Sequence, residues 1–155
     1  MVELDAFDIK MLVQLQHDAR TTSERLAELL GLSPTACQRR LKRLRASGVI
    51  SAEIAVIDPA ATGNWITLIA HASLVRGRPE IVDAFKKDVR RTPEIQQCFY
   101  VTGDYAFVMV VVVQDIRAYD QLIRKLFMEN PNILKFQTSM VIDTVKTGLS
   151  LPFQS

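Results

Sequence analysis

Three segments at the start of the chain carry apolar residues at the three- and four-residue spacing of amphipathic helices. We expect the first helix over 5–18, with Asp5 as its N-cap, because a carboxylate can accept hydrogen bonds from the free amides of the first turn. The second helix follows a cap at Thr21 or Thr22 and stops at Gly31, since glycine commonly ends a helix.

The third helix begins very soon after the second one ends. Ser33 can cap it, and Pro34 takes the first helical position, where a missing N–H costs nothing. Its apolar stripe is Cys37, Leu41 and Leu44, which we expect to face inward. Two helices joined by such a short, glycine-containing turn predict a helix-turn-helix unit.

The second half of the chain alternates strand and helix patterns. We expect elements in the order strand 65–75, helix 79–91, strand 95–102, strand 105–113, helix 116–129 and strand 132–143. This βαββαβ order predicts a ferredoxin-like antiparallel sheet with both helices on one face, and so an α+β chain. Between the halves, 49–57 is rich in β-forming residues and could pair as a wing or connector.

The strand pattern AFVMVVVVQ, at 106–114, is apolar at both odd and even positions. Helices on one side of the sheet would leave one of its faces in water. A second copy of the chain is the economical cover for that face, so we expect a homodimer through the sheets.

Composition narrows the class of protein. The 155 residues suffice for one ordinary domain or two small ones, and no run of about 18 apolar residues could span a bilayer. The start MVELDAFDIK lacks the pattern of a secretory signal, so we expect a cytoplasmic protein with no membrane partner. Cys37 and Cys98 show no metal-ligand spacing, and we expect neither a metal nor a cofactor.

Charge is concentrated on the third helix. Five of the seven residues from Arg39 to Arg45 are basic, and 33–47 contains no Asp or Glu, although residues 1–60 as a whole are neutral. A solvated helix face would normally carry acids one turn away, so we expect an external polyanion, double-stranded DNA. We expect Thr35 and Gln38 to read bases, and Arg39 to contact either bases or phosphates. The expected phosphate contacts are Arg40, Lys42, Arg43 and Arg45.

Several stretches together resemble the leucine-responsive/AsnC (Lrp/AsnC) family of transcriptional regulators. They are LDAFDIKMLVQLQHDART, ERLAELLGLSPTACQRRLKRLRASGVI, DPAATG, VTGDYAF and QTSMVI, in this order. The resemblance implies a winged helix-turn-helix domain and a regulatory domain that dimerises sheet to sheet, with dimers assembling into octamers or other multiples. It places recognition-helix positions on Ser33, Pro34, Thr35, Gln38, Arg39, Lys42 and Arg43, and it places Arg40 beside the DNA backbone.

The resemblance also implies a small effector, an amino acid in many members, bound where dimers meet. Gly103, Asp104 and Tyr105 match the turn of the family's effector region, whereas Ala106 stands where the family commonly has a carboxylate. That carboxylate would suit the ammonium group of an amino acid. Thr138 and Ser139 align with a polar segment near the same region.

The expected domains are a helix-turn-helix domain at 1–50, a strand and linker at 51–64, a regulatory and dimerisation domain at 65–144, and a tail at 145–155. The expected function is sequence-specific regulation of transcription in amino-acid or related metabolism, without catalysis. Two alternatives stay open: an enzyme resembling the siroheme decarboxylases of the same architecture, and an oligomeric regulator without an effector.

Overall fold

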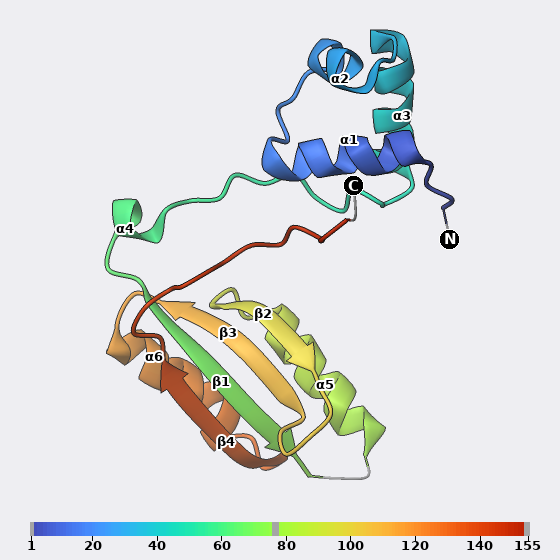
Figure 1. The fold of residues 1–155 in the computed structure, drawn as a ribbon. Helices are drawn as coiled ribbons and strands as arrows, with labels where there is room; N and C mark the ends of the chain where they lie inside the picture. Colours follow the sequence, from blue (N-terminus) through green and yellow to red (C-terminus); the bar gives the residue numbers. More distant parts are fainter. Residues whose placement is uncertain (1, 76–77, 154–155) are drawn as a thin grey trace. The chain divides into compact units, whose positions relative to one another are not determined.

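A computed structural model describes residues 2–75 and 78–153. The chain forms two compact units (Figure 1). The first comprises Met1–Val56 together with the C-terminal segment Thr147–Ser155, and the second comprises Ile57–Lys146.

The first unit is built on three helices whose ends follow the local sequence. Helix α1 (Ala6–His17) is capped by Asp5, whose carboxylate accepts from the Asp8 N–H at 2.9 Å. Helix α2 (Ser23–Leu30) is capped by Thr22 and ends at Gly31, which adopts a left-handed φ of 68°. Helix α3 (Pro34–Ala46) is capped by Ser33. The predicted helix-turn-helix is therefore confirmed.

A single apolar cluster holds the three helices together. The predicted stripe of α3 lies inside it, with Cys37 and Leu44 completely buried and Leu41 nearly so. Helix α1 contributes its own buried face, and α2 contributes two residues. The other buried members are Met11, Leu12, Leu15, Leu26 and Ala27.

The segment after α3 differs from the prediction. Residues 49–58 form no strand, so the expected wing is absent from this part of the chain. Ile54 and Val56 are 69% and 90% exposed, and the four strands that the structure describes all belong to the second unit. β-forming composition alone does not make a strand, because each strand needs a hydrogen-bonding partner. A short helix, α4 (Pro59–Thr62), follows with Asp58 as its cap.

The second unit is a four-stranded antiparallel sheet in the order β2-β3-β1-β4, backed by helices (Figure 1). Its elements are β1 (Ile66–Leu74), α5 (Pro79–Arg90), β2 (Ile95–Tyr100), β3 (Phe107–Val113), α6 (Ile116–Ile123), the π-helical turn η1 (Arg124–Met128) and β4 (Ile133–Met140). The predicted βαββαβ order is confirmed, although the last helix continues as a wider turn.

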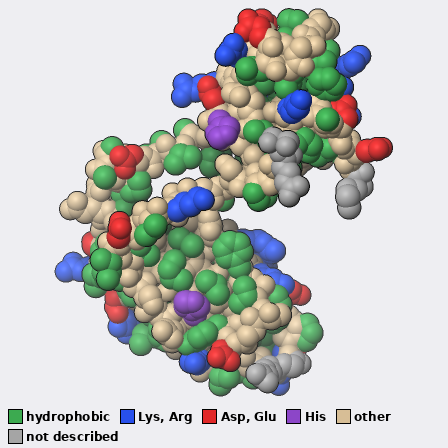
Figure 2. Space-filling view, in the orientation of Figure 1, with side chains coloured by type: hydrophobic (Ala, Val, Ile, Leu, Met, Phe, Trp, Pro, Cys, Tyr) green, Lys and Arg blue, Asp and Glu red, His purple; other side chains and the backbone are tan. Residues whose placement is uncertain are grey.

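The two faces of the sheet have different surroundings. Alternate residues of β1 and β3, such as Leu68 and Met109, are buried under α5 and α6. Val108, Val110 and Val112 lie on the other, open face and are only partly buried. Hydrophobic side chains gather over this open face (Figure 2). On α6, Leu122 and Ile123 are buried against the sheet, whereas Ile116 at its start is 52% exposed.

The C-terminal segment packs on α1 of the same chain. The side-chain amide of Gln16 accepts from the Leu151 N–H at 2.6 Å and donates to the Leu151 carbonyl at 3.2 Å. Phe153 packs against the apolar cluster of the first unit, whereas Leu149 and Leu151 are largely exposed. The tail is thereby part of the first unit.

Candidate nucleic-acid interface and effector region

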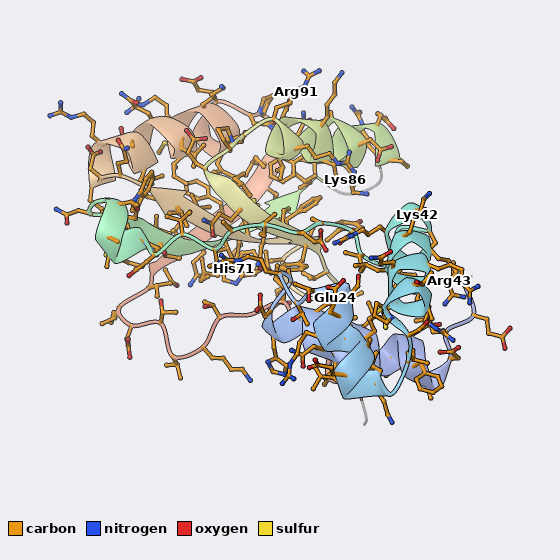
Figure 3. All side chains as sticks on the ribbon, turned by 90° about the horizontal axis from the view of Figure 1, so that it is seen from above. Glu24, Lys42, Arg43, His71, Lys86 and Arg91 are labelled. Carbon is orange, nitrogen blue, oxygen red and sulfur yellow. The ribbon has the colours of Figure 1, made fainter. Side chains whose placement is uncertain are left out.

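Helix α3 presents a polar face to solvent. Thr35, Gln38, Arg39 and Lys42 are all exposed, as are Ser33 and Pro34 at its start. The Ser33 hydroxyl is occupied in capping, since it accepts from the Ala36 N–H at 3.2 Å. Figure 3 shows Lys42 projecting away from the body of α3. The side chains expected to read bases therefore lie free at the N-terminal end of the helix.

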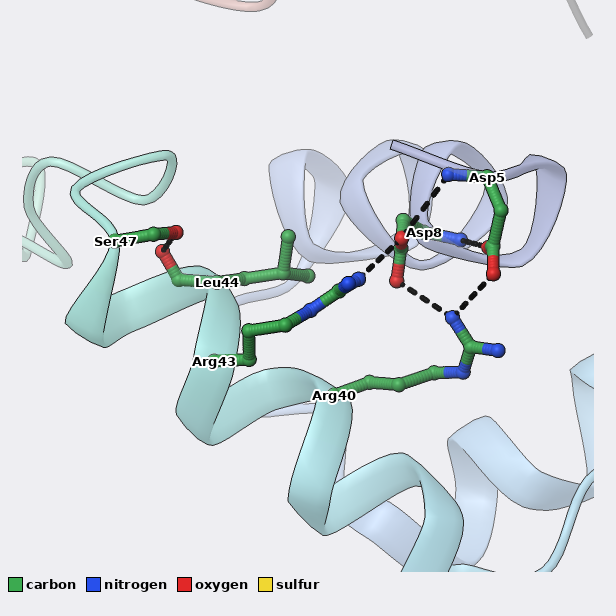
Figure 4. A network of polar contacts seen from close by, with 6 residues as sticks. All are labelled: Asp5, Asp8, Arg40, Arg43, Leu44 and Ser47. Carbon is green, nitrogen blue, oxygen red and sulfur yellow. Dashed lines mark hydrogen bonds and ion pairs between the residues drawn. The ribbon is translucent and has the colours of Figure 1, made fainter. Parts of the chain in front are cut away.

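Arg40 and Arg43 are instead held by acids of α1 and its cap (Figure 4). One guanidinium nitrogen of Arg40, Nη1, lies 2.7 Å from Oδ2 of Asp5 and 2.9 Å from Oδ1 of Asp8. Arg43 donates through Nη2 to Oδ2 of Asp8. We call these four residues the Asp8 network.

The carboxylates of the Asp8 network stay ionised. Burial alone would raise the pKa of Asp8, but hydrogen bonds from Arg43, the Asp5 N–H and Arg40 outweigh it and lower that pKa below its usual value. The Asp8 N–H and Arg40 lower the pKa of Asp5 in the same way. Both acids are therefore anions at neutral pH, as their arginine partners require.

Arg45, the fifth cation of the cluster, has an acid partner too. Its Nη2 lies 2.7 Å from Oε1 of Glu53, in the segment that follows α3. The expectation that no internal acid offsets the basic helix was thus wrong for Arg40, Arg43 and Arg45. The compensating acids lie outside 33–47, where spacing along the helix could not reveal them. For Arg40 and Arg43, the acids at the start of the first helix were the signal that could have done so.

Two cations of α3, Arg39 and Lys42, remain available to an external anion. Within the described part of the chain, neither forms an ion pair. Both side chains are exposed. The free positive charge of the helix is therefore smaller than its composition suggests, and it lies on the same polar surface as Thr35 and Gln38.

The expected effector turn lies in the loop between β2 and β3. Gly103 adopts a φ of 122°, a conformation that favours glycine, and Asp104 is exposed. The loop is tied to β1 by the Ser73 hydroxyl, which donates to the Asp104 carbonyl at 2.9 Å, and by the Ala106 N–H, which donates to the Ala72 carbonyl.

Tyr105 reaches from this loop across the open face of the sheet. Its hydroxyl donates to Oε1 of Gln137 at 2.7 Å, and its ring centroid lies 5.2 Å from that of His71 (His71 is labelled in Figure 3). The Lys135 ammonium lies 4.5 Å from the same ring centroid. His71, Lys135 and Gln137 are neighbours of Tyr105 that the sequence pattern did not bring to this region.

Thr138 and Ser139 lie on opposite faces of the sheet. Thr138 pairs with Ala70 on the helix-covered side of the sheet, and the Tyr119 hydroxyl of α6 donates to its hydroxyl. Burial raises the pKa of Tyr119, which keeps it a neutral donor. Ser139 pairs with Ile69 and belongs to the open face. Only Ser139 shares a face with Tyr105.

The described residues offer neither a cluster of metal ligands nor a membrane-spanning helix. No group of three or more His, Cys, Asp or Glu side chains in 2–75 and 78–153 is placed to hold a metal ion. None of the helices described is both long and apolar enough to cross a bilayer.

Two protein-family models match the chain. The AsnC-type helix-turn-helix domain matches residues 4–45, and the Lrp/AsnC ligand binding domain matches residues 67–151. The first range spans α1, α2 and nearly all of α3, and the second spans nearly the whole sheet.

Curated proteins and solved structures give similar matches. The chain is 45% identical over 153 residues to the HTH-type transcriptional regulator y4tD of Sinorhizobium fredii, which covers 99% of this chain and 90% of that protein. It is 34% identical over 143 residues to the leucine-responsive regulatory protein of Haemophilus influenzae, covering 92% and 86%.

Among solved structures, a transcriptional regulator of Neisseria meningitidis in complex with L-Met has a TM-score of 0.88 at 29% identity, with 97% of each chain covered. An AsnC family transcriptional regulator from Agrobacterium tumefaciens has a TM-score of 0.87 at 28% identity, covering 96% of this chain and 97% of that one.

Proposed function

Because the chain belongs to the Lrp/AsnC family of transcriptional regulators, we propose that it binds double-stranded DNA through α3 and changes this binding in response to a small effector. The observation that carries the proposal is the exposed face of α3, where Thr35, Gln38, Arg39 and Lys42 lie free above a buried apolar stripe. Polar side chains near the start of a recognition helix reach base edges, while cations neutralise phosphates.

The DNA-binding surface that we propose is narrower than the sequence pattern suggested. Ser33 and Pro34 set the start of the helix, Thr35 and Gln38 read bases, and Arg39 and Lys42 contact phosphate. Arg40, Arg43 and Arg45 lie at its border, with their charge shared with acids of the same chain. The function assigned to 1–50 is thus DNA recognition, with 51–64 as the connection to the regulatory domain at 65–144.

Selection from a pool of randomised duplexes tests this function. The wild-type chain should enrich one motif, and Gln38→Ala should relax the preference at one base pair by about 1–3 kcal/mol. Lys42→Ala is the matched control, because losing a phosphate contact should weaken binding to the selected and the random duplex equally. Failure of the wild-type chain to enrich any sequence would contradict the proposal.

We further propose that the effector is an amino acid or a related metabolite. The regulator from Neisseria meningitidis was solved with L-Met, and the second unit here matches the ligand binding domain of the same family. The region that we assign to it is Gly103, Asp104, Tyr105, Ala106 and Ser139, and Thr138 supports this region from the other side of the sheet. The acid that would suit an ammonium group is absent at Ala106.

Thermal unfolding in the presence of each of the twenty amino acids tests the effector. A ligand at a hundredfold its dissociation constant should stabilise the protein by about 2.7 kcal/mol. Tyr105→Phe should reduce that shift, because it removes the hydroxyl on the open face, whereas Tyr119→Phe, its matched control on the helix side, should not. If no amino acid shifts the wild-type transition, the alternative of an effector-free regulator becomes the better description.

The partner that we propose for the open sheet face is a second copy of the chain, and the dimers then assemble into octamers or other multiples. The partly buried valines of β3 on that face support this assignment. The enzyme alternative is not favoured, because the relatives named above are transcriptional regulators. The proposed assembly brings two α3 helices to one DNA molecule, as regulators with paired half-sites require.

A further inference from the structure

Asp8 is the one charged side chain that is fully buried among the described residues. It lies in the first turn of α1, where it exchanges hydrogen bonds with Asp5: each backbone N–H donates to the carboxylate of the other residue, at 3.1 and 2.9 Å. A buried carboxylate is costly unless charged donors satisfy it. The side chains that donate hydrogen bonds to Asp8 are therefore expected to be held in fixed positions.

Those donors come from two turns of α3. Arg40 donates to Oδ1 and Arg43 donates to Oδ2, so each oxygen of Asp8 is bound by a different arginine. Arg40 also donates to Asp5 and lies 5.6 Å from the ring centroid of Phe7. Three residues at the start of α1 thus contact the guanidinium group of Arg40. Together with the bond from Arg43, this joins α3 to α1 through two side chains.

We propose that Asp8 is the positioning residue of the recognition helix and that it withholds Arg40 and Arg43 from DNA. The inference rests on the proposed DNA-binding function of α3. Arg39 and Lys42 are then the cations of this helix that neutralise phosphates, while Arg40 and Arg43 set the angle at which Thr35 and Gln38 meet the bases.

This difference between free and paired cations has a consequence that binding measurements can detect. Each phosphate neutralised by a free cation releases counterions, and the logarithm of the binding constant then falls with the logarithm of salt concentration by about 0.9 per contact. An arginine whose charge is already paired with Asp8 contributes nothing to this slope. From the number and position of the cations alone, each would be expected to contribute equally to the salt slope.

Fluorescence anisotropy on the full chain, with one random-sequence and one selected duplex over a series of salt concentrations, tests the proposal. Arg39→Met should flatten the salt slope by about 0.9. Arg40→Met, the matched change one residue further along, should leave the slope unchanged while lowering the melting temperature and the ratio of selected to random binding. Asp8→Asn should steepen the slope by about 0.9, since it removes the acid partner of Arg43, whereas Arg40 keeps its ion pair with Asp5.

A purely structural role for the network would lower the melting temperature of all its variants without steepening the slope in Asp8→Asn. A flattening of about 0.9 in Arg40→Met would show that this arginine touches phosphate and would overturn the inference. If Asp8→Asn does not fold, Arg40→Met and Arg43→Gln still decide between the outcomes. Absence of salt-dependent DNA binding in the wild-type chain would instead contradict the proposed function itself.

Discussion

Leu44→Ala is expected to lower the free energy of unfolding of the first unit by about 2–5 kcal/mol and to abolish DNA binding. Leu44 is completely buried between α3 and its neighbours. The loss is comparable to the whole stability of a small domain, so the three helices should no longer hold together near body temperature. Circular dichroism should show a lower midpoint temperature for the unfolding of the first unit, and fluorescence anisotropy should show no DNA binding.

Leu29→Ala provides the matched control for this variant. Leu29 is 46% exposed on α2, so the same change removes little buried surface and should cost well under the Leu44 value. The second unit should keep its own transition in both variants, because its core shares no buried residue with the first. Intact DNA binding by Leu44→Ala would show that the unit does not depend on this stripe.

Phe85→Ala is expected to cost the second unit about 3–5 kcal/mol and to disrupt assembly. The ring of Phe85 is 1% exposed, and its centroid lies 4.7 Å from that of Phe107 and 6.2 Å from that of Phe127. Truncation leaves a large cavity between α5 and the sheet. Thermal unfolding should show a lowered second transition, and sedimentation should show smaller species.

Phe99→Ala separates folding from assembly. Phe99 is 52% exposed and pairs with Val108 on the open face of the sheet. Its loss should leave the thermal transition nearly unchanged while weakening the proposed dimer. A variant that lowers the transition of the second unit as much as Phe85→Ala does would contradict the assignment of Phe99 to a surface between copies.

The helices and strands could be predicted because their signals are local. Asp5, Thr22 and Ser33 cap the helices that they precede, and Gly31 ends α2 in a left-handed conformation, as expected for a residue without Cβ. The βαββαβ order of the elements followed from the alternation of strand and helix patterns along the chain. The segment 49–57 misled because strand propensity says nothing about whether a partner strand is present.

The candidate site was less predictable because it depends on contacts between distant residues. Arg40 and Arg43 meet Asp8 across 32 and 35 positions of the sequence, and spacing within α3 could not show this. Thr138 and Ser139 are adjacent in sequence, yet strand alternation sends them to opposite faces of the sheet. The sequence predicts which side chains a helix or strand exposes, but it does not show which charged side chains already have an ion-pair partner in the same chain.

The packing of Phe153 against the first unit decides when that unit can be completed during synthesis. Domains generally fold as units while the ribosome extends the chain from its N-terminus. Here the last residues of the first unit are made only after all of 57–146. Helices α1, α2 and α3 therefore leave the ribosome long before Phe153, which packs against their apolar cluster. The DNA-binding unit of a newborn chain is therefore completed only after the whole regulatory unit has been synthesised.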